Sequence, residues 1–330
     1  MLNRRLMLAA TLGALALPSG PALAQAPEKL PVVASFSILG DLVRQVGGDR
    51  VAVTTLVGPG GDAHVYEPTP ADAKRVAAAK LVLVNGLGFE GWLDRLAKAS
   101  GTKAPVVVAT TGITPLAAPD DDDDDDHGHA HGKDAHGKGA HKDSHKDAHA
   151  GHDHGGLDPH AWQSIQNAKV YVANIRDALT AADPAGREAY AANAAAYSAK
   201  LDALDAEVKA AMAAIPAERR RIITSHDAFA YFGNAYGLTL IAPQGVSTES
   251  EASAKDVARI IRQIKADKIP AVFMENISDP RLVTRIAKET GARIGGALYS
   301  DALSDDKGPA STYIDMMRSN VRTLSSALSS

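Results

Sequence analysis

The sequence predicts an α/β protein of two lobes, each built around a mostly parallel central sheet, joined by one long rigid linker helix. Both halves of the chain alternate short apolar or β-branched runs with helical segments, which is typical of parallel β/α folds. Between the halves lies an Ala-rich segment whose large apolar residues recur at three- and four-residue steps, as in a long helix. At 330 residues the chain also exceeds the usual size of a single core.

The first half supplies four strand patterns. Each is a short apolar run rich in Val, Ile or Leu and bounded by Gly, Pro or polar residues. Helical periodicity fills the segments between them, beginning at Asp41, Ala71 and Phe89. The four expected strands cover residues 32–38, 51–57, 81–84 and 106–109.

The second half repeats the alternation after a helix over residues 165–179 and the long helix over residues 187–215. A further helix is expected from Ser250, because Thr248 and Glu251 resemble a capping box. The remaining expected elements are strands over 221–225, 238–242 and 271–274, and helices over 228–236, over 280–290 and from Ser311.

An export signal and two lobes follow from this pattern. Residues 1–24 predict a signal peptide, with Arg4 and Arg5 before an apolar run and an Ala-Leu-Ala cleavage site. The paired arginines leave the general and the twin-arginine export routes both open. We expect a first lobe over residues 25–186, the linker helix over 187–215 and a second lobe over 216–330.

The composition limits the location and the partners. No later stretch approaches the roughly 18 uninterrupted apolar residues that span a bilayer. The chain has no cysteine, so we expect no lipid anchor, no disulfide and no thiolate metal ligand. These features predict a soluble protein that is free in the periplasm. A formal net charge of −4 argues against a nucleic-acid partner.

The composition changes abruptly over residues 116–156. Seven consecutive Asp residues, 120–126, precede nine histidines set among Gly, Ala, Lys and Asp, a composition that cannot form a core. We expect a disordered Asp/His-rich loop with weak auxiliary zinc sites that assists zinc acquisition or transfer, with a simple solvated spacer as the alternative. Its histidines are His127, His129, His131, His136, His141, His145, His149, His152 and His154.

Only three histidines lie outside this loop, and each is expected just after a strand or at the start of a helix. They are His64, in a long Gly- and Pro-rich loop, His160, after an Asp-Pro turn, and His226, after an expected strand. The carboxyl ends of parallel strands face the crevice where α/β proteins bind ligands, so the three imidazoles can converge. Taken alone, a loop histidine such as His64 is more often a solvated residue or a helix cap than a ligand. The simpler alternative is helix capping for His160 and a polar residue that lines the cleft for His226.

Three neutral imidazoles and one carboxylate would satisfy the tetrahedral coordination of Zn²⁺ without a thiolate. Two residues near the expected end of the second sheet are candidates for the carboxylate, Glu275 and Asp301. Spacing along the chain does not choose between them. The residues therefore predict a zinc site with three histidine ligands and a fourth ligand that is either Glu275 or Asp301.

Five stretches, in order along the chain, resemble the metal-binding solute-binding proteins of cluster A-I, the zinc and manganese family of ABC importers. The stretches are Gly-Gly-Asp-Ala-His-Val-Tyr-Glu-Pro at 60–68, Asn-Gly-Leu-Gly-Phe-Glu at 85–90 with Trp-Leu at 92–93, Asp-Pro-His-Ala-Trp at 158–162, Ser-His-Asp-Ala-Phe at 225–229 and Tyr-Ser-Asp-Ala-Leu at 299–303. The resemblance covers nearly everything after residue 30 and implies the cluster A-I solute-binding fold.

The resemblance also implies a ligand set. The metal would be held between the lobes by His64 and His160 of the first lobe and by His226 and Asp301 of the second, with Glu275 beside them. Relatives that carry manganese usually have a carboxylate where this sequence has His226. The resemblance therefore favours Zn²⁺, carried as cargo in one tight site.

By the same resemblance the chain is a binding protein rather than an enzyme, and we expect a monomer that delivers zinc to the permease of an inner-membrane ABC importer. A periplasmic zinc metallochaperone is considered as a second partner. Three alternatives stay open: manganese or iron as cargo of the same fold, a secreted zinc hydrolase with three protein ligands and a metal-bound water, and an adhesin on the same scaffold.

Overall fold

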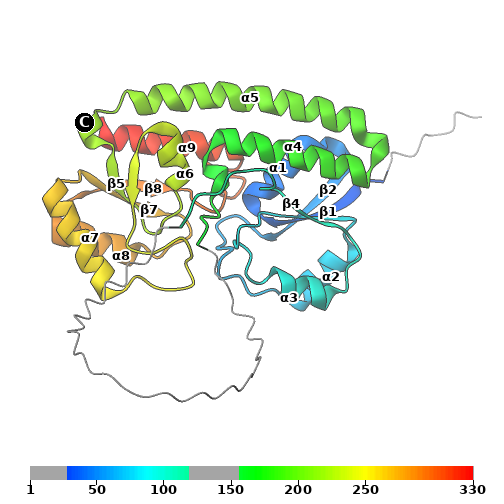
Figure 1. Ribbon diagram of the computed structural model, residues 1–330, viewed down its shortest axis with the longest axis horizontal. Coiled ribbons are helices and arrows are strands. Elements are labelled where there is room, and N and C mark those ends of the chain that lie inside the picture. Colours follow the sequence, from blue (N-terminus) through cyan, green and yellow to red (C-terminus); the bar gives the residue numbers. More distant parts are fainter. Residues whose placement is uncertain (1–27, 119–155, 330) are drawn as a thin grey trace, which may run out of the picture.

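The computed structural model describes residues 28–118 and 156–329, so the predicted signal peptide and the nine histidines of the Asp/His-rich loop lie outside the described residues. Two lobes lie side by side beneath a helix that runs across both (Figure 1), and each contains one four-stranded sheet. The predicted fold class is confirmed. Over the described residues, the structure has no helix with the length and apolar character needed to cross a membrane.

The first lobe holds a parallel sheet of strand order β2-β1-β3-β4. Its two central strands are almost fully buried, which explains their continuous apolar runs rather than an alternating pattern. The lobe consists of β1 (Leu30–Phe36), α1 (Ser37–Gly47), β2 (Val51–Val57), α2 (Pro70–Ala78), β3 (Leu81–Val84), α3 (Leu93–Ser100), β4 (Val106–Val108) and α4 (Ile165–Ala182).

The second lobe repeats this arrangement with the strand order β6-β5-β7-β8, again all parallel. In both lobes the strand order reverses beside the first strand, which is where open α/β sheets form their ligand crevice. The lobe consists of β5 (Arg221–Ile223), α6 (Ala230–Tyr236), β6 (Thr239–Ile241), α7 (Ala254–Asp267), β7 (Ala271–Glu275), α8 (Pro280–Thr290), β8 (Arg293–Leu298) and α9 (Tyr313–Leu328).

Helix α5 (Arg187–Ala213) is the long element at the top of Figure 1. It packs against α1 and α4 of the first lobe and against α6 and α9 of the second. Its buried side chains recur at three- and four-residue steps, as the sequence predicted, and form one apolar stripe along 27 residues. The stripe consists of Tyr190, Ala194, Tyr197, Leu201, Leu204, Val208 and Met212.

One continuous hydrophobic cluster extends from the first sheet through α5 to α9 and the inner face of the second sheet. Trp162, Tyr171 and Tyr313 are among its largest fully buried side chains. A second, smaller cluster fills the space between the second sheet and α7 and α8. The two lobes therefore share most of one core.

Three features of the structure differ from the expectation. Strand β8 was not predicted, because Gly295 and Gly296 interrupt its apolar run. Helix α3 begins at Leu93 rather than at Phe89, since residues 86–88 have positive φ and form a turn. The capping box before α7 is wrong: Ser253 caps this helix, and the Thr248 hydroxyl instead donates to Asp62 of the first lobe.

Residues 116–118 and 156 were expected to belong to the disordered loop, but they are described and paired. Ala117 pairs with Leu157 in an antiparallel bridge, and the Ala118 amide donates to the Gly156 carbonyl at 2.6 Å. The Asp158 amide likewise donates to the Leu116 carbonyl at 2.9 Å. We call residues 116–118 and 156–158 the stem, since they join the first lobe to the Asp/His-rich loop.

Candidate metal centre

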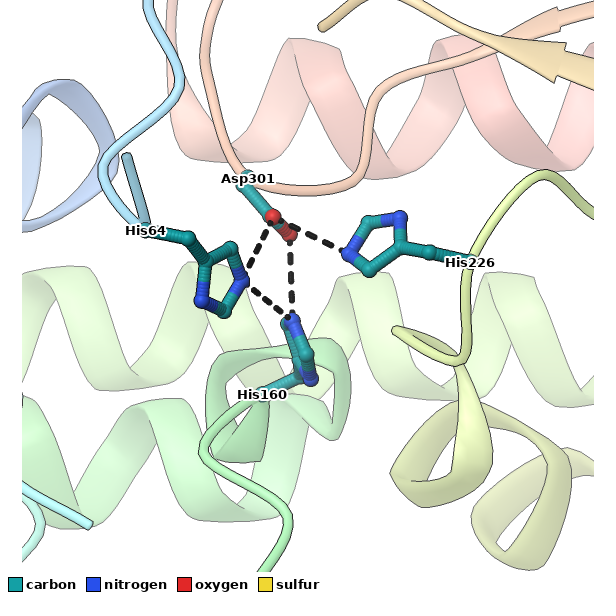
Figure 2. Close-up of side chains that lie close together, drawn as sticks. All are labelled: His64, His160, His226 and Asp301. Atoms are coloured by element: carbon teal, nitrogen blue, oxygen red, sulfur yellow. Dashed lines mark hydrogen bonds and ion pairs between the residues drawn. The ribbon is translucent and has the colours of Figure 1, made fainter. Parts of the chain in front are cut away.

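The three histidines outside the loop converge with Asp301 between the lobes. His64 lies in the loop after β2, His226 follows β5, Asp301 follows β8, and His160 directly precedes a 3₁₀ turn at Ala161–Gln163. Figure 2 shows the three imidazoles pointing at the Asp301 carboxylate from three sides. Two ligand candidates thus come from each lobe.

The facing atoms have the spacing of a small coordination shell. His64 Nε2 lies 3.3 Å from both His160 Nε2 and Asp301 Oδ2. Asp301 Oδ2 is 3.2 Å from His226 Nε2, and Asp301 Oδ1 is 3.5 Å from His160 Nε2. A tetrahedral ion with ligands at about 2.0–2.1 Å separates them by about 3.3 Å from one another. All four ligand atoms lie within 4.8 Å of one another.

Burial leaves several of these atoms without a hydrogen-bond partner. His160, His226 and Asp301 are 0% exposed, and His64 is 5% exposed. Among the described residues, His226 Nε2 and both Asp301 oxygens find no hydrogen-bond partner. Buried polar atoms without partners are costly, so a cluster of them around one point favours a cation that satisfies them together. The donor set therefore fits a divalent metal.

The loop that carries His64 is fixed at three points. Asp62 Oδ1 accepts a hydrogen bond from the His64 backbone amide at 2.9 Å. The Trp92 indole donates to the Ala63 carbonyl at 2.7 Å. The edge of the Phe89 ring packs against the imidazole, with 4.7 Å between the ring centroids. These contacts explain how a loop residue can hold one orientation.

His160 is held by the Asp-Pro turn that precedes it. Asp158 Oδ1 accepts from the His160 backbone amide at 2.8 Å and lies 2.7 Å from the imidazole Nδ1. The Pro159 carbonyl accepts from the Asn85 side chain at 2.9 Å. Trp162 packs against the imidazole, with ring centroids 5.3 Å apart. The contact at Nδ1 turns Nε2 toward the site.

Glu275 lies behind His226 rather than among the four converging atoms. One oxygen, Oε1, accepts from the backbone amides of Ser225 and His226 at 2.7 and 2.9 Å. The other, Oε2, lies 2.5 Å from His226 Nδ1 as an ion pair without the alignment of a hydrogen bond. A carboxylate beside the far nitrogen of an imidazole orients the ring and raises its basicity.

Side chains of both lobes hold the segment that carries Asp301. The Ser300 carbonyl accepts from the Trp162 indole at 2.9 Å and from Gln163 at 2.7 Å. On the other side of Asp301, the Asn276 side chain donates to the Ala302 carbonyl at 3.1 Å. The carboxylate is therefore positioned through its neighbours' backbone, which leaves both of its oxygens free for a ligand.

Burial and charge shift the pKa values of the site in different directions. Burial lowers the pKa of His160, but Asp301 and Asp158 outweigh it and raise the pKa to about 9. Burial also opposes the charged form of His226, but Glu275 and Asp301 raise the pKa of this histidine well above its usual value. For His64, burial wins and lowers the pKa. Burial would raise the pKa of Asp301, yet His160 and His226 hold it well below its usual value.

The aspartates that hold two of the histidines were not predicted from the sequence. Asp62 and Asp158 each lie two residues before a histidine, and each accepts the backbone amide of that histidine. An aspartate two positions before an otherwise isolated histidine is a recognisable signal for a fixed imidazole. The nine histidines of the Asp/His-rich loop lie outside the described residues, so the proposed auxiliary sites are not part of this geometry.

Comparison with known proteins places this geometry in a family. The profile of the family "Zinc-uptake complex component A periplasmic" matches residues 32–327. The chain belongs to this family. The zinc-uptake family consists of periplasmic substrate-binding proteins of ABC transporters, so the expectation that the chain is not an enzyme is confirmed.

Named relatives bind different metals. The iron-binding protein YfeA of Yersinia pestis is 35% identical over 90% of this chain and 86% of its own length. The manganese-binding lipoprotein MntA of Halalkalibacterium halodurans is 35% identical over 92% of this chain and 89% of its own length. MntA is named a lipoprotein, whereas we expect no lipid anchor on this chain. The absence of an anchor here stays a prediction.

Two solved structures share the fold of this chain. The periplasmic zinc-binding protein TroA of Treponema pallidum has a TM-score of 0.77 and 29% identity, covering 92% of this chain and 100% of its own. A mutant manganese-bound periplasmic metal-binding protein of Candidatus Liberibacter asiaticus has a TM-score of 0.75 and 32% identity, covering 91% and 100%. The fold is therefore shared by proteins whose names give different metals.

Proposed function

We propose that this protein captures Zn²⁺ between its two lobes in the periplasm and delivers it to the inner-membrane permease of an ABC importer. The observation that carries the proposal is the buried set of His64, His160, His226 and Asp301, whose ligand atoms all lie within 4.8 Å of one another, with four of the separations between 3.2 and 3.5 Å. In this proposal Zn²⁺ is the cargo, and the four residues are its ligands. Glu275 and Asp158 orient two of the imidazoles.

Zinc is proposed over manganese and iron because three of the four ligands are imidazoles. Imidazole suits Zn²⁺, whereas Mn²⁺ prefers a larger share of oxygen ligands. The names of YfeA and MntA keep iron and manganese as the second candidates. Four protein ligands also leave no position for a reactive water, which supports carriage over hydrolysis.

The location and the partners belong to the same proposal. Residues 1–24 would direct export, and the mature chain would act in the periplasm as an unanchored monomer. The Asp/His-rich loop would collect zinc or accept it from a periplasmic metallochaperone, since interrupted histidines bind metal weakly and exchange it quickly.

A competition titration tests this function. Zn²⁺, Mn²⁺ and Fe²⁺ would each compete with a chromogenic chelator for the mature protein and for a variant with His64, His160 and His226 changed to alanine. We expect one tight zinc ion per wild-type chain, weaker manganese and iron, and loss of tight zinc in the variant.

A variant that lacks residues 120–154 but keeps all four ligands is the matched control, and it should retain the tight ion. If the triple variant still binds zinc tightly, the tight site lies elsewhere in the chain. Tighter binding of manganese or iron than of zinc in the wild type would overturn the proposed cargo.

A further inference from the structure

We propose that Tyr231 of the second lobe is a positioning residue for the metal site: its hydroxyl holds the segment that carries His160 and so slows metal release. The inference rests on the proposed function. Tyr231 lies in the first turn of α6, where its side chain is 4% exposed. Its hydroxyl forms hydrogen bonds with the backbone of the stem rather than with the four converging side chains.

The Tyr231 hydroxyl bridges the two segments of the stem. It donates to the Asp158 carbonyl at 3.0 Å and accepts from the Leu116 amide at 3.0 Å. The Asp158 amide in turn donates to the Leu116 carbonyl at 2.9 Å. The three hydrogen bonds form a closed ring of two first-lobe backbone segments and one second-lobe side chain.

The same Asp158 reaches the ligand. Its carbonyl is held by Tyr231, while its carboxylate holds both the backbone amide and the Nδ1 of His160. Only Pro159 separates the two residues along the chain. A shift of the stem would therefore carry the imidazole with it, because backbone and side chain are both tied to Asp158.

Metal release needs at least one ligand to move away. His160 is 0% exposed and packed against Trp162, so its ring cannot swing out unless its segment moves. The bond from Tyr231 ties that segment to the lobe that supplies His226 and Asp301. The hydroxyl thus links ligands of both lobes, and its removal lowers the barrier to their separation.

Helix α6 also provides a matched control. Tyr236 lies on the same helix, and its hydroxyl also crosses to the first lobe, where it accepts from the Ile165 amide at 3.3 Å. It donates to Asp205 of α5 at 2.9 Å. Tyr236→Phe therefore removes a buried inter-lobe hydroxyl with two hydrogen bonds, but one that does not touch the stem.

The experiment measures zinc release from the mature full chain into excess chelator by stopped flow, for wild type, Tyr231→Phe and Tyr236→Phe. Thermal melts of the three metal-free proteins report the loss of stability. We expect release about tenfold faster from Tyr231→Phe, the lower end of what outer ligand supports contribute, and within about twofold of wild type from Tyr236→Phe. Both variants should melt at similarly lowered temperatures.

A double-mutant cycle with Asp158→Asn separates the positioning of His160 through Asp158 from a general loss of stability. If Tyr231 acts through Asp158, Tyr231→Phe should accelerate release much less in the Asp158→Asn background, whereas Tyr236→Phe should be additive. Equal release from wild type and Tyr231→Phe, or equal acceleration by both tyrosine variants, overturns the inference while leaving the zinc site intact. A wild type that binds no zinc tightly overturns the proposed function itself.

Discussion

At the residue scale, the site is an unequal set of imidazoles around one buried carboxylate. His160 and His226 each have a second carboxylate beside Nδ1, which favours their protonated forms before metal arrives. Among the described residues, no carboxylate forms a hydrogen bond or ion pair with His64 Nδ1, and burial lowers the pKa of this histidine. In the metal-free protein, protons on His160 and His226 offset the charges of the carboxylates, and a divalent ion would replace them.

This balance predicts the pH dependence of binding. A histidine must lose its proton to bind metal, and the pKa of His160 is about 9 in the metal-free protein. Zinc affinity should therefore fall as pH drops below about 9, by about tenfold per pH unit for each proton displaced. A histidine with the ordinary pKa of about 6.5 would place this fall at a lower pH.

Calorimetric titration in buffers of different ionisation enthalpy checks this directly. At pH 7.5, zinc binding should release at least one proton per chain. Binding that releases no proton between pH 6 and 8 would contradict the charged state of His160.

In the same metal-free protein, the raised pKa of His160 stabilises the fold fully below about pH 6.5, and this stabilisation is lost as pH rises through about 9.

The carboxylate of the site shows what the sequence could not decide at this scale. Glu275 ends β7, and Asp301 follows β8, two adjacent strands, so both lie at the same edge of the sheet. Position along the chain cannot tell which side chain enters the crevice, and only the family resemblance favoured Asp301. The structure puts Asp301 among the imidazoles and Glu275 behind His226.

At the element scale, most strands and helices could be predicted because each has one strong local signal. Buried parallel strands such as β1 and β3 read as short apolar runs, and α8 is bounded by Pro280 and Gly291. Strand β8 lacked such a signal, since its glycines weaken the strand pattern. The capping box predicted at Thr248 was wrong because the Thr248 hydroxyl donates a hydrogen bond to Asp62 of the first lobe rather than capping α7.

The stem predicts the outcome of removing the Asp/His-rich loop. Because the Ala118 amide bonds to the Gly156 carbonyl, deletion of residues 120–154 leaves Pro119 and Gly155 to connect two segments that are already paired. We expect the tight zinc affinity to stay within about threefold of wild type, since all four ligands and their supports remain. The rate of loading at low zinc should fall, because the collecting histidines are gone.

A second variant that keeps the length of the loop but changes its nine histidines to asparagine separates imidazole chemistry from chain length. Stopped-flow loading from a buffered zinc supply measures both variants. Slow loading in both supports collection by the histidines. Unchanged loading in both would assign the loop the role of a spacer.

At the scale of the whole molecule, the two lobes are held together by a shared hydrophobic core and by inter-lobe hydrogen bonds. The main hydrophobic cluster crosses between them, and α5 packs on helices of both. Buried side chains add inter-lobe bonds: Asp41 of α1 accepts from the Tyr313 amide of α9 at 2.8 Å, and the Tyr313 hydroxyl donates to the Trp162 carbonyl at 2.7 Å. A wide hinge opening would break these contacts, which favours small loop movements for metal exchange.

This shared core predicts how the protein unfolds. Calorimetry of the metal-free mature protein should give one transition rather than two, because neither lobe can unfold without exposing the core of the other. Zinc at about 1,000 times its dissociation constant should stabilise the fold by about 4 kcal/mol and raise the melting temperature of that single transition. The triple histidine variant should show no such rise. Two transitions, of which zinc shifts only one, would mean that the lobes unfold independently and that one lobe alone supplies the site.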